Sequence, residues 1–289
     1  MAPAVDFTPF YSCDRDRVLV FRSTWPADIV GNPREAEMSR FRQIFSLAAG
    51  AVALMASSTM ATAQVAAKSV VLVHGAFADG SSWRKVIPQL EKAGLKVIAV
   101  QNALQSLEND VATTRRAIRD AEAPIVLVGH SYGGIVITEA GNDPKVGALV
   151  YVAAYAPDSG EAQSHIASRY PQQESRAEYI RDEDGFLRIS DAGISRYFAP
   201  DLAAAEQRLV AAVQGRLHAR TLATPIIRAA WRDKPTFMAV ATNDAIIPPQ
   251  LQKDQVERSR ATSIEVPSSH VAMLSFPEKI SELIIRAAR

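Results

Sequence analysis

The stretch from Pro124 to Gly134 constrains the fold of this chain more than any other, because it turns an apolar run into a helix within a few residues. Residues 125–128 (Ile-Val-Leu-Val) form a short β-branched run, which predicts a buried strand. Residues 129–133 (Gly-His-Ser-Tyr-Gly) follow at once and match the pattern G-x-S-x-G. Apolar residues 135–137 and Ala140 then predict a helix. This order indicates a sharp strand-to-helix turn.

The serine of this turn is a candidate nucleophile. A turn this sharp lifts the Ser131 hydroxyl out of the sheet and directs the Tyr132 backbone N–H toward a developing negative charge. An ordinary glycine-rich turn would match the five-residue pattern equally well. The strand before the turn and the helix after it favour the catalytic interpretation.

The rest of the chain alternates apolar runs with amphipathic segments. A helix is expected from Ser106, its cap, through Ile118, and another over residues 277–288. Further strands are expected at residues 69–73, 96–100, 148–152, 236–241 and 263–266. The strands are continuously apolar, which predicts an α/β fold with a six-stranded, mostly parallel sheet and helices on both faces. Functional residues of such sheets gather at the carboxyl ends of the strands.

One interval, residues 157–234, interrupts this alternation and shows no strong strand. Asp201 is expected to cap a helix that extends to Val213. A disordered linker is the alternative, but several aromatic residues argue for packing: Tyr170, Tyr179, Phe186, Tyr197, Phe198 and Trp231. We expect a helical cap over the carboxyl ends of the strands.

A serine nucleophile needs a general base. His270 follows the last strand on a loop at the carboxyl edge, which is where such a base belongs. His130 adjoins Ser131 within the turn and is expected to point away from it. His74 ends the first strand and is expected to support the following loop, whereas His165 and His218 lie in the insertion.

The base in turn needs an acid that orients it. The chain order of serine, acid and histidine leaves Asp244, directly after the fifth strand, and Asp158, after the fourth. We favour Asp244, because it ends the strand next to the one that delivers His270. The second oxyanion donor is expected in residues 74–77, through the Ala76 N–H, with Phe77 directed into the pocket.

These residues together resemble the α/β-hydrolase fold, over residue 68 to the end. Within it, residues 74–77 (His-Gly-Ala-Phe), 129–134, 151–157 (Tyr-Val-Ala-Ala-Tyr-Ala-Pro) and 269–271 (Ser-His-Val) resemble the branch of plant methyl esterases, hydroxynitrile lyases and small bacterial esterases. The resemblance implies a nucleophile, an acid, a base and a helical cap over the site; the matching triad is Ser131, Asp244 and His270.

The chain departs from the lyases of that branch at two positions. They carry Thr at the position of Gly75 and Lys at that of Val271, and that lysine holds the cyano group. Its absence favours ester hydrolysis by a carboxylesterase-like serine hydrolase. A lyase on the same triad, and a non-catalytic ligand-binding protein of receptor type, are the alternatives.

The expected substrate is a small-molecule ester with a largely apolar acyl or alcohol group. The side chains expected to bind it are Phe77, Trp231, Ile246, Val271 and Met273. A net charge of +1 gives no indication of nucleic acid as a partner, and no Cys-His cluster suggests a metal. No cofactor is expected. The one cysteine, Cys13, excludes an intramolecular disulfide.

The N-terminal part has the pattern of a targeting signal. Arg40 and Arg42 precede the apolar residues 44–56, and Ala-Thr-Ala at 61–63 is a cleavage site, so residues 38–63 are expected to be a signal peptide. The apolar run is too short for a membrane anchor. Met38 is the expected start, which makes residues 1–37 a non-native or untranslated extension, and residues 64–289 the mature domain. The predicted location is periplasmic or extracellular.

Overall fold

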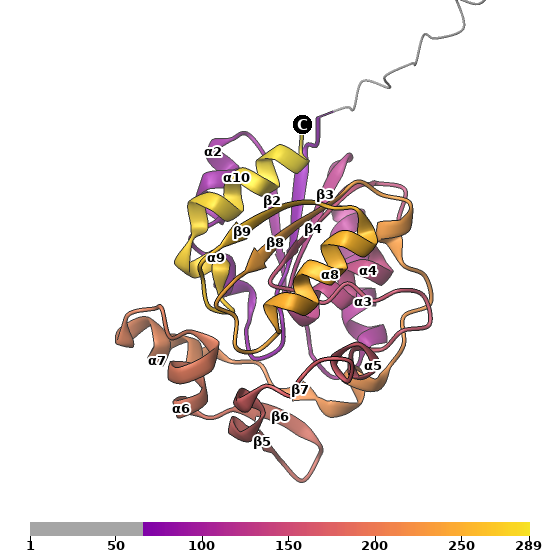
Figure 1. Cartoon of the computed structure of the whole chain (residues 1–289). Helices are drawn as coiled ribbons and strands as arrows, with labels where there is room; N and C mark the ends of the chain where they lie inside the picture. Colours follow the sequence, from indigo (N-terminus) through magenta and orange to yellow (C-terminus); the bar gives the residue numbers. More distant parts are fainter. Residues whose placement is uncertain (1–65) are drawn as a thin grey trace, which may run out of the picture. The chain divides into compact units, whose positions relative to one another are not determined.

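The computed structural model describes residues 66–289 of the chain (Figure 1). The expected signal peptide (38–63), the expected start at Met38, the extension 1–37 and Cys13 lie outside the described residues. Within residues 66–289, no helix has both the length and the apolar character needed to cross a membrane.

Six strands of the described part form one sheet in the order β2-β1-β3-β4-β8-β9, and every pairing in it is parallel. The strands are β1 (Ser69–Val73), β2 (Lys96–Val100), β3 (Ile125–His130), β4 (Val146–Val152), β8 (Thr236–Ala241) and β9 (Thr262–Val266). The sheet confirms the predicted fold class. Strand β3 runs two residues further than expected, through Gly129 to His130, so it ends directly at Ser131.

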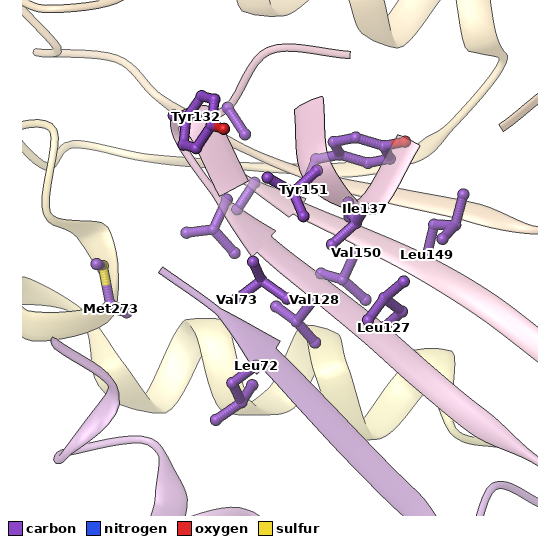
Figure 2. Packing of buried hydrophobic residues seen from close by; sticks show 14 of the residues in the cluster. Leu72, Val73, Leu127, Val128, Tyr132, Ile137, Leu149, Val150, Tyr151 and Met273 are labelled. Atoms are coloured by element: carbon purple, nitrogen blue, oxygen red, sulfur yellow. The ribbon is translucent and has the colours of Figure 1, made fainter. Parts of the chain in front are cut away.

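The central strands form the core of the sheet. Every residue of β1 and β3 is buried, whereas the edge strands β2 and β9 are partly exposed. Figure 2 shows side chains of β1, β3 and β4 packed together, with Ile137 of the helix that follows β3 beside them. Each such side chain contributes about 1.5–3 kcal/mol by its burial.

Helices cover both faces of the sheet (Figure 1). Helices α2 (Ile87–Lys92) and α10 (Pro277–Ala287) pack together on one face, while α3 (Leu107–Asp120), α4 (Tyr132–Ala140) and α8 (Pro249–Ser259) lie on the other. The short helix α9 (Ala272–Ser275) precedes α10. The expected cap of α3 is present, since the Asn109 N–H donates to Ser106 Oγ at 3.2 Å.

The insertion between β4 and β8 differs from the expectation of helices alone. It holds an antiparallel sheet of β5 (Tyr179–Arg181), β6 (Phe186–Ile189) and β7 (Leu217–His218). These strands are too short to give a periodic signal in the sequence. Its helices are α5 (Gln163–Ala167), α6 (Asp191–Gly193) and α7 (Ala204–Val213), with single-turn helices Glu174–Glu178, Ile194–Phe198, Ala219–Ala223 and Ala230–Arg232.

The prediction that Asp201 caps a helix was wrong. Helix α7 begins at Ala204, with Ala203 as the residue before it and no side-chain cap. The Asp201 carboxylate instead accepts hydrogen bonds from the N–H and the hydroxyl of Ser269, at 2.8 and 2.6 Å. Asp201 therefore anchors the loop that carries His270 to the insertion.

Candidate active site

Ser131 occupies a strained turn between β3 and α4. Its φ of 53° and ψ of −121° are values that residues with a side chain rarely adopt. Two glycines allow β1, β3 and α4 to approach one another closely at this turn. A Cβ on Gly129 would lie 2.5 Å from the Gly133 carbonyl oxygen, and one on Gly133 would lie 2.5 Å from the Val73 carbonyl oxygen. The turn therefore depends on contact between α4 and the ends of β1 and β3.

The structure brings Ser131, His270 and Asp244 into one buried, hydrogen-bonded row. The His270 Nε2 atom lies 2.8 Å from Ser131 Oγ, and Nδ1 lies 2.8 Å from Asp244 Oδ2. A carboxylate only accepts hydrogen bonds, so Nδ1 carries the proton and donates it to Asp244. Nε2 is then left to accept the Ser131 hydroxyl proton.

Asp244 is held in place from several sides. Its Oδ1 accepts the N–H groups of Ile246 and Ile247 at 2.8 and 3.0 Å, and its Oδ2 also accepts Gln252 Nε2 at 2.9 Å. These bonds satisfy the buried carboxylate and fix its orientation toward His270.

The alternative acid, Asp158, lies in a different environment. It forms an ion pair with Arg232, whose Nε donates to Oδ1 at 2.7 Å. That hydrogen bond lowers the pKa of the Asp158 carboxyl. Asp158 therefore forms an ion pair within the insertion, whereas Asp244 bonds to the histidine.

Both expected oxyanion donors line the cavity that contains Ser131. Tyr132 is the first residue of α4, so its N–H has no acceptor within the helix. The neighbouring Phe77 N–H donates to the Gly215 carbonyl at 3.1 Å, which fixes the loop that carries Ala76. The two residues that carry the expected donors thus line the same cavity as Ser131.

Tyr132 is also anchored by a buried acid that was not predicted from the sequence. Its hydroxyl donates to Asp110 Oδ2 at 2.9 Å, and the Leu104 N–H donates to Oδ1 at 3.0 Å. Burial raises the pKa of Asp110. A signal was present, because Asp110 lies on the apolar face of α3, three residues after Leu107 and four before Thr114.

His130 connects the turn to the base, although its side chain was expected only to point away from Ser131. Its Nε2 lies 2.9 Å from the His270 carbonyl oxygen and therefore donates to it. The two imidazole rings lie 4.7 Å apart. Burial holds the pKa of His130 well below its usual value, so the ring is neutral.

His74 supports the loop that follows β1, as the sequence predicted. Its Nδ1 donates to the Gly75 carbonyl at 2.8 Å, and Nε2 accepts the Asn102 N–H at 2.9 Å. Burial lowers the pKa of this histidine as well.

The cavity at Ser131 is small, about 50 Å³, and largely apolar. Phe77 and Ile246 line it, as expected. The sequence did not predict most of its remaining wall, which comes from helix α4, from the loop after β4 and from the insertion. These residues are Ile135, Tyr155, Gln163, Tyr179, Leu217 and Leu222.

Three expected substrate-binding residues do not line this cavity. Val271 and Met273 face a separate cavity of about 20 Å³ behind Phe77. Trp231 is buried in the fold: its Nε1 donates to the Pro157 carbonyl at 2.7 Å, and the Arg232 guanidinium lies 5.0 Å from its ring. These positions correct the prediction. Residues 271–273 turn away after His270, and Trp231 packs at the base of the insertion.

No group of three or more His, Cys, Asp or Glu side chains within residues 66–289 is arranged to hold a metal ion. The site combines a serine hydroxyl with an oriented imidazole, beside a cavity that Ala76 and Tyr132 line.

A parallel sheet with a serine at the strand-to-helix turn, and an acid and a histidine at the next carboxyl ends, defines the class of α/β-hydrolases. The sequence matches the alpha/beta hydrolase family over residues 70–283. The chain belongs to the alpha/beta hydrolase family.

Two curated relatives are similar over most of their length. Salicylic acid-binding protein 2 of Nicotiana tabacum is 27% identical over 254 residues, covering 76% of this chain and 97% of that protein. Methylesterase 3 of Arabidopsis thaliana is 26% identical over 253 residues, covering 76% and 95%. A solved pyrethroid hydrolase from Sphingobium faniae JZ-2 has the same fold, with a TM-score of 0.65, 21% identity, and coverage of 76% of this chain and 97% of that one.

The buried neutral state of His130 predicts a pH dependence of stability. Below about pH 6.5 the unfolded chain binds a proton at this histidine and the folded chain does not, so the free energy of unfolding falls as the pH falls. In His130→Gln this contribution is lost, while an amide N–H can still donate to the His270 carbonyl. Between about pH 5 and 6.5, the free energy of unfolding of the variant should therefore change less steeply with pH than that of the wild type, by up to about 1.4 kcal/mol per pH unit.

Urea unfolding across this pH range measures the slope. His165→Gln is the matched control, because His165 is exposed in the folded chain. Equal slopes for wild type and His130→Gln would contradict the prediction.

Proposed function

We propose that this protein is a serine hydrolase that cleaves carboxylic esters through an acyl-enzyme. The observation that carries the proposal is the row of Ser131, His270 and Asp244 beside a cavity that Ala76 and Tyr132 also line. The similarity to Methylesterase 3 of Arabidopsis thaliana supports ester hydrolysis as the reaction.

The first half of the proposed cycle forms the acyl-enzyme. Ser131 Oγ attacks the acyl carbon while its proton passes to His270 Nε2, and Asp244 stabilises the resulting imidazolium. The carbonyl oxygen becomes an oxyanion that accepts hydrogen bonds from Ala76 and Tyr132. When the tetrahedral intermediate collapses, the ester C–O bond breaks and His270 returns the proton to the departing alcohol.

The second half repeats these steps with water. His270 Nε2 takes a proton from a water molecule, whose oxygen attacks the acyl carbon. The same two N–H groups stabilise the second oxyanion. The bond to Ser131 Oγ then breaks, the serine regains its proton from His270, and the carboxylic acid is released.

The space beside Ser131 favours a small, largely apolar group at the reacting centre. The cavity of about 50 Å³ is bounded by Phe77, Ile135 and Ile246, with Leu217 and Leu222 of the insertion. We therefore propose short acyl or alcohol groups at this position, as in a methyl or acetyl ester.

A first prediction concerns the nucleophile. Ser131→Ala should reduce p-nitrophenyl acetate hydrolysis to background, because no hydroxyl remains to form the acyl-enzyme. A serine-directed phosphonate should add one adduct to the wild type, on Ser131, and none to the variant. Intact-mass and peptide mass spectrometry measure the adduct.

Ser281→Ala is the control, since this buried serine of α10 lies away from the cavity. Substantial ester turnover by Ser131→Ala would refute the mechanism. Cleavage of a cyanohydrin with no ester turnover would indicate a lyase, and ligand binding without turnover in the wild type would indicate a receptor.

A second prediction separates the two candidate acids. Asp244→Asn should lower kcat by about 10⁴-fold, as a comparable change does in a serine protease, because an asparagine amide can favour the wrong imidazole tautomer. Asp158→Asn, which weakens only the ion pair with Arg232, should stay within a few-fold of wild type. Steady-state kinetics with circular dichroism to check folding measures both. The opposite ranking would make Asp158 the orienting acid.

We also propose that the protein is exported, on the basis of the charged, apolar and Ala-Thr-Ala segments of residues 40–63. Residues 38–68 fused to a reporter that functions only outside the cytoplasm should yield reporter activity, with cleavage after Ala63. Replacing the Ala-Thr-Ala alanines by bulky residues should block the cleavage. A fusion that stays in the cytoplasm would contradict the proposal.

A further inference from the structure

A second, much larger cavity adjoins the one at Ser131. Its volume is about 610 Å³, against about 50 Å³ for the inner cavity. The two share a wall, because Tyr155, Gln163, Tyr179, Leu222 and Ile246 line both. A substrate that reacts at Ser131 and is larger than a few atoms must extend into this outer cavity.

The outer cavity is polar where the inner one is apolar. Hydroxyl and amide side chains line it, from Gln163, Ser164, Ser168, Gln172 and Gln173. Arg176 carries the one charged side chain among the described residues that line this cavity, and none of these residues is acidic. The wall therefore offers a positive charge, surrounded by neutral hydrogen-bonding groups.

The guanidinium of Arg176 has no carboxylate partner among the described residues, and no acceptor there binds it. Two other arginines of the insertion and one of α8 are paired with carboxylates. Arg169 and Arg258 bind Glu161, and Arg232 binds Asp158. Arg176 thus remains free to bind an anion from solution.

The position of Arg176 is set by its neighbour. Ser175 is buried, and its hydroxyl donates to the Ala245 carbonyl at 2.8 Å, directly after Asp244 in the chain. The single-turn helix that carries Arg176 is thereby tied to the loop of the proposed catalytic acid.

Arg176 also lies close enough for its charge to affect the two tyrosines that line both cavities. Burial raises the pKa of Tyr155 to about 12, and the charge of Arg176 acts in the opposite direction. Burial raises the pKa of Tyr179 too, again with Arg176 opposing it. Both phenols stay neutral at ordinary pH, so they do not compete with an anion for the guanidinium.

We propose that the enzyme prefers esters that carry a carboxylate several bonds from the reacting carbonyl, and that Arg176 binds this carboxylate in the outer cavity. The inference rests on the proposed ester hydrolysis and adds its substrate class. The small alcohol group, such as methoxy, lies in the inner cavity, and the acyl chain runs past Tyr155 and Tyr179. Arginine suits this task because its planar fork can bind both carboxylate oxygens.

The test compares two substrates of equal length. Monomethyl adipate carries the carboxylate, and its terminal amide analogue, methyl 5-carbamoylpentanoate, is neutral. At low ionic strength the wild type should show the higher kcat/KM for the anionic ester. Arg176→Gln should lower the ratio of the two kcat/KM values by about 10-fold or more, as loss of a charged hydrogen-bonded pair does. Arg176→Lys should keep part of the preference.

Arg208→Gln is the matched control, because Arg208 is an exposed arginine of α7 outside both cavities. It should keep the wild-type ratio. An equal fall in the ratio for Arg208→Gln would show general charge attraction and overturn the inference.

A ratio at or below one in the wild type, or a ratio unchanged by Arg176→Gln, would also overturn it. These failures are distinct from failure of the proposed function, in which the wild type would hydrolyse neither ester and the phosphonate would not label Ser131.

Discussion

The site depends on one close contact, that of helix α4 with the ends of β1 and β3. This contact is possible because Gly129 and Gly133 have no side chains, and it holds Ser131 at a φ of 53°. Backbone strain of this kind costs about 1–3 kcal/mol. The fully buried central strands offset it, and the bond from Tyr132 to Asp110 holds the first turn of α4 in place.

The insertion does more than cover the site, because it is hydrogen-bonded to three loops that carry proposed catalytic groups. Asp201 binds the loop of His270, Ser175 binds the loop of Asp244, and Gly215 binds the loop of Ala76. The same segment that shapes the cavities therefore positions the base, the acid and an oxyanion donor. We infer that changes in the insertion affect substrate choice and turnover together.

Much of the site could be predicted because its parts have fixed places in the order of the strands. Ser131, Asp244 and His270 each follow a strand, and parallel strands deliver their carboxyl ends to one edge. Side chains that act through contacts distant in the sequence were missed. His130 was placed correctly in the turn, but its bond to the His270 carbonyl joins residues 140 positions apart. In the sequence, Asp110 is simply a polar residue on the apolar face of a helix. Its role becomes visible only in the structure, where it accepts the Tyr132 hydroxyl.

The sequence by itself determined where the strands of the sheet lie along the chain, the serine turn and the edge at which the reactive groups meet, because hydrophobic periodicity and glycine spacing act over a few residues. Only the tertiary structure decided the pocket walls. Trp231 and Met273 have the apolar character of wall residues, yet one packs at the base of the insertion and the other behind Phe77. Tyr155, from the loop after β4, and Tyr179, from the insertion, form the wall instead. Short strands and single-turn helices fold the insertion over Ser131, and those depend on long-range packing rather than on local pattern.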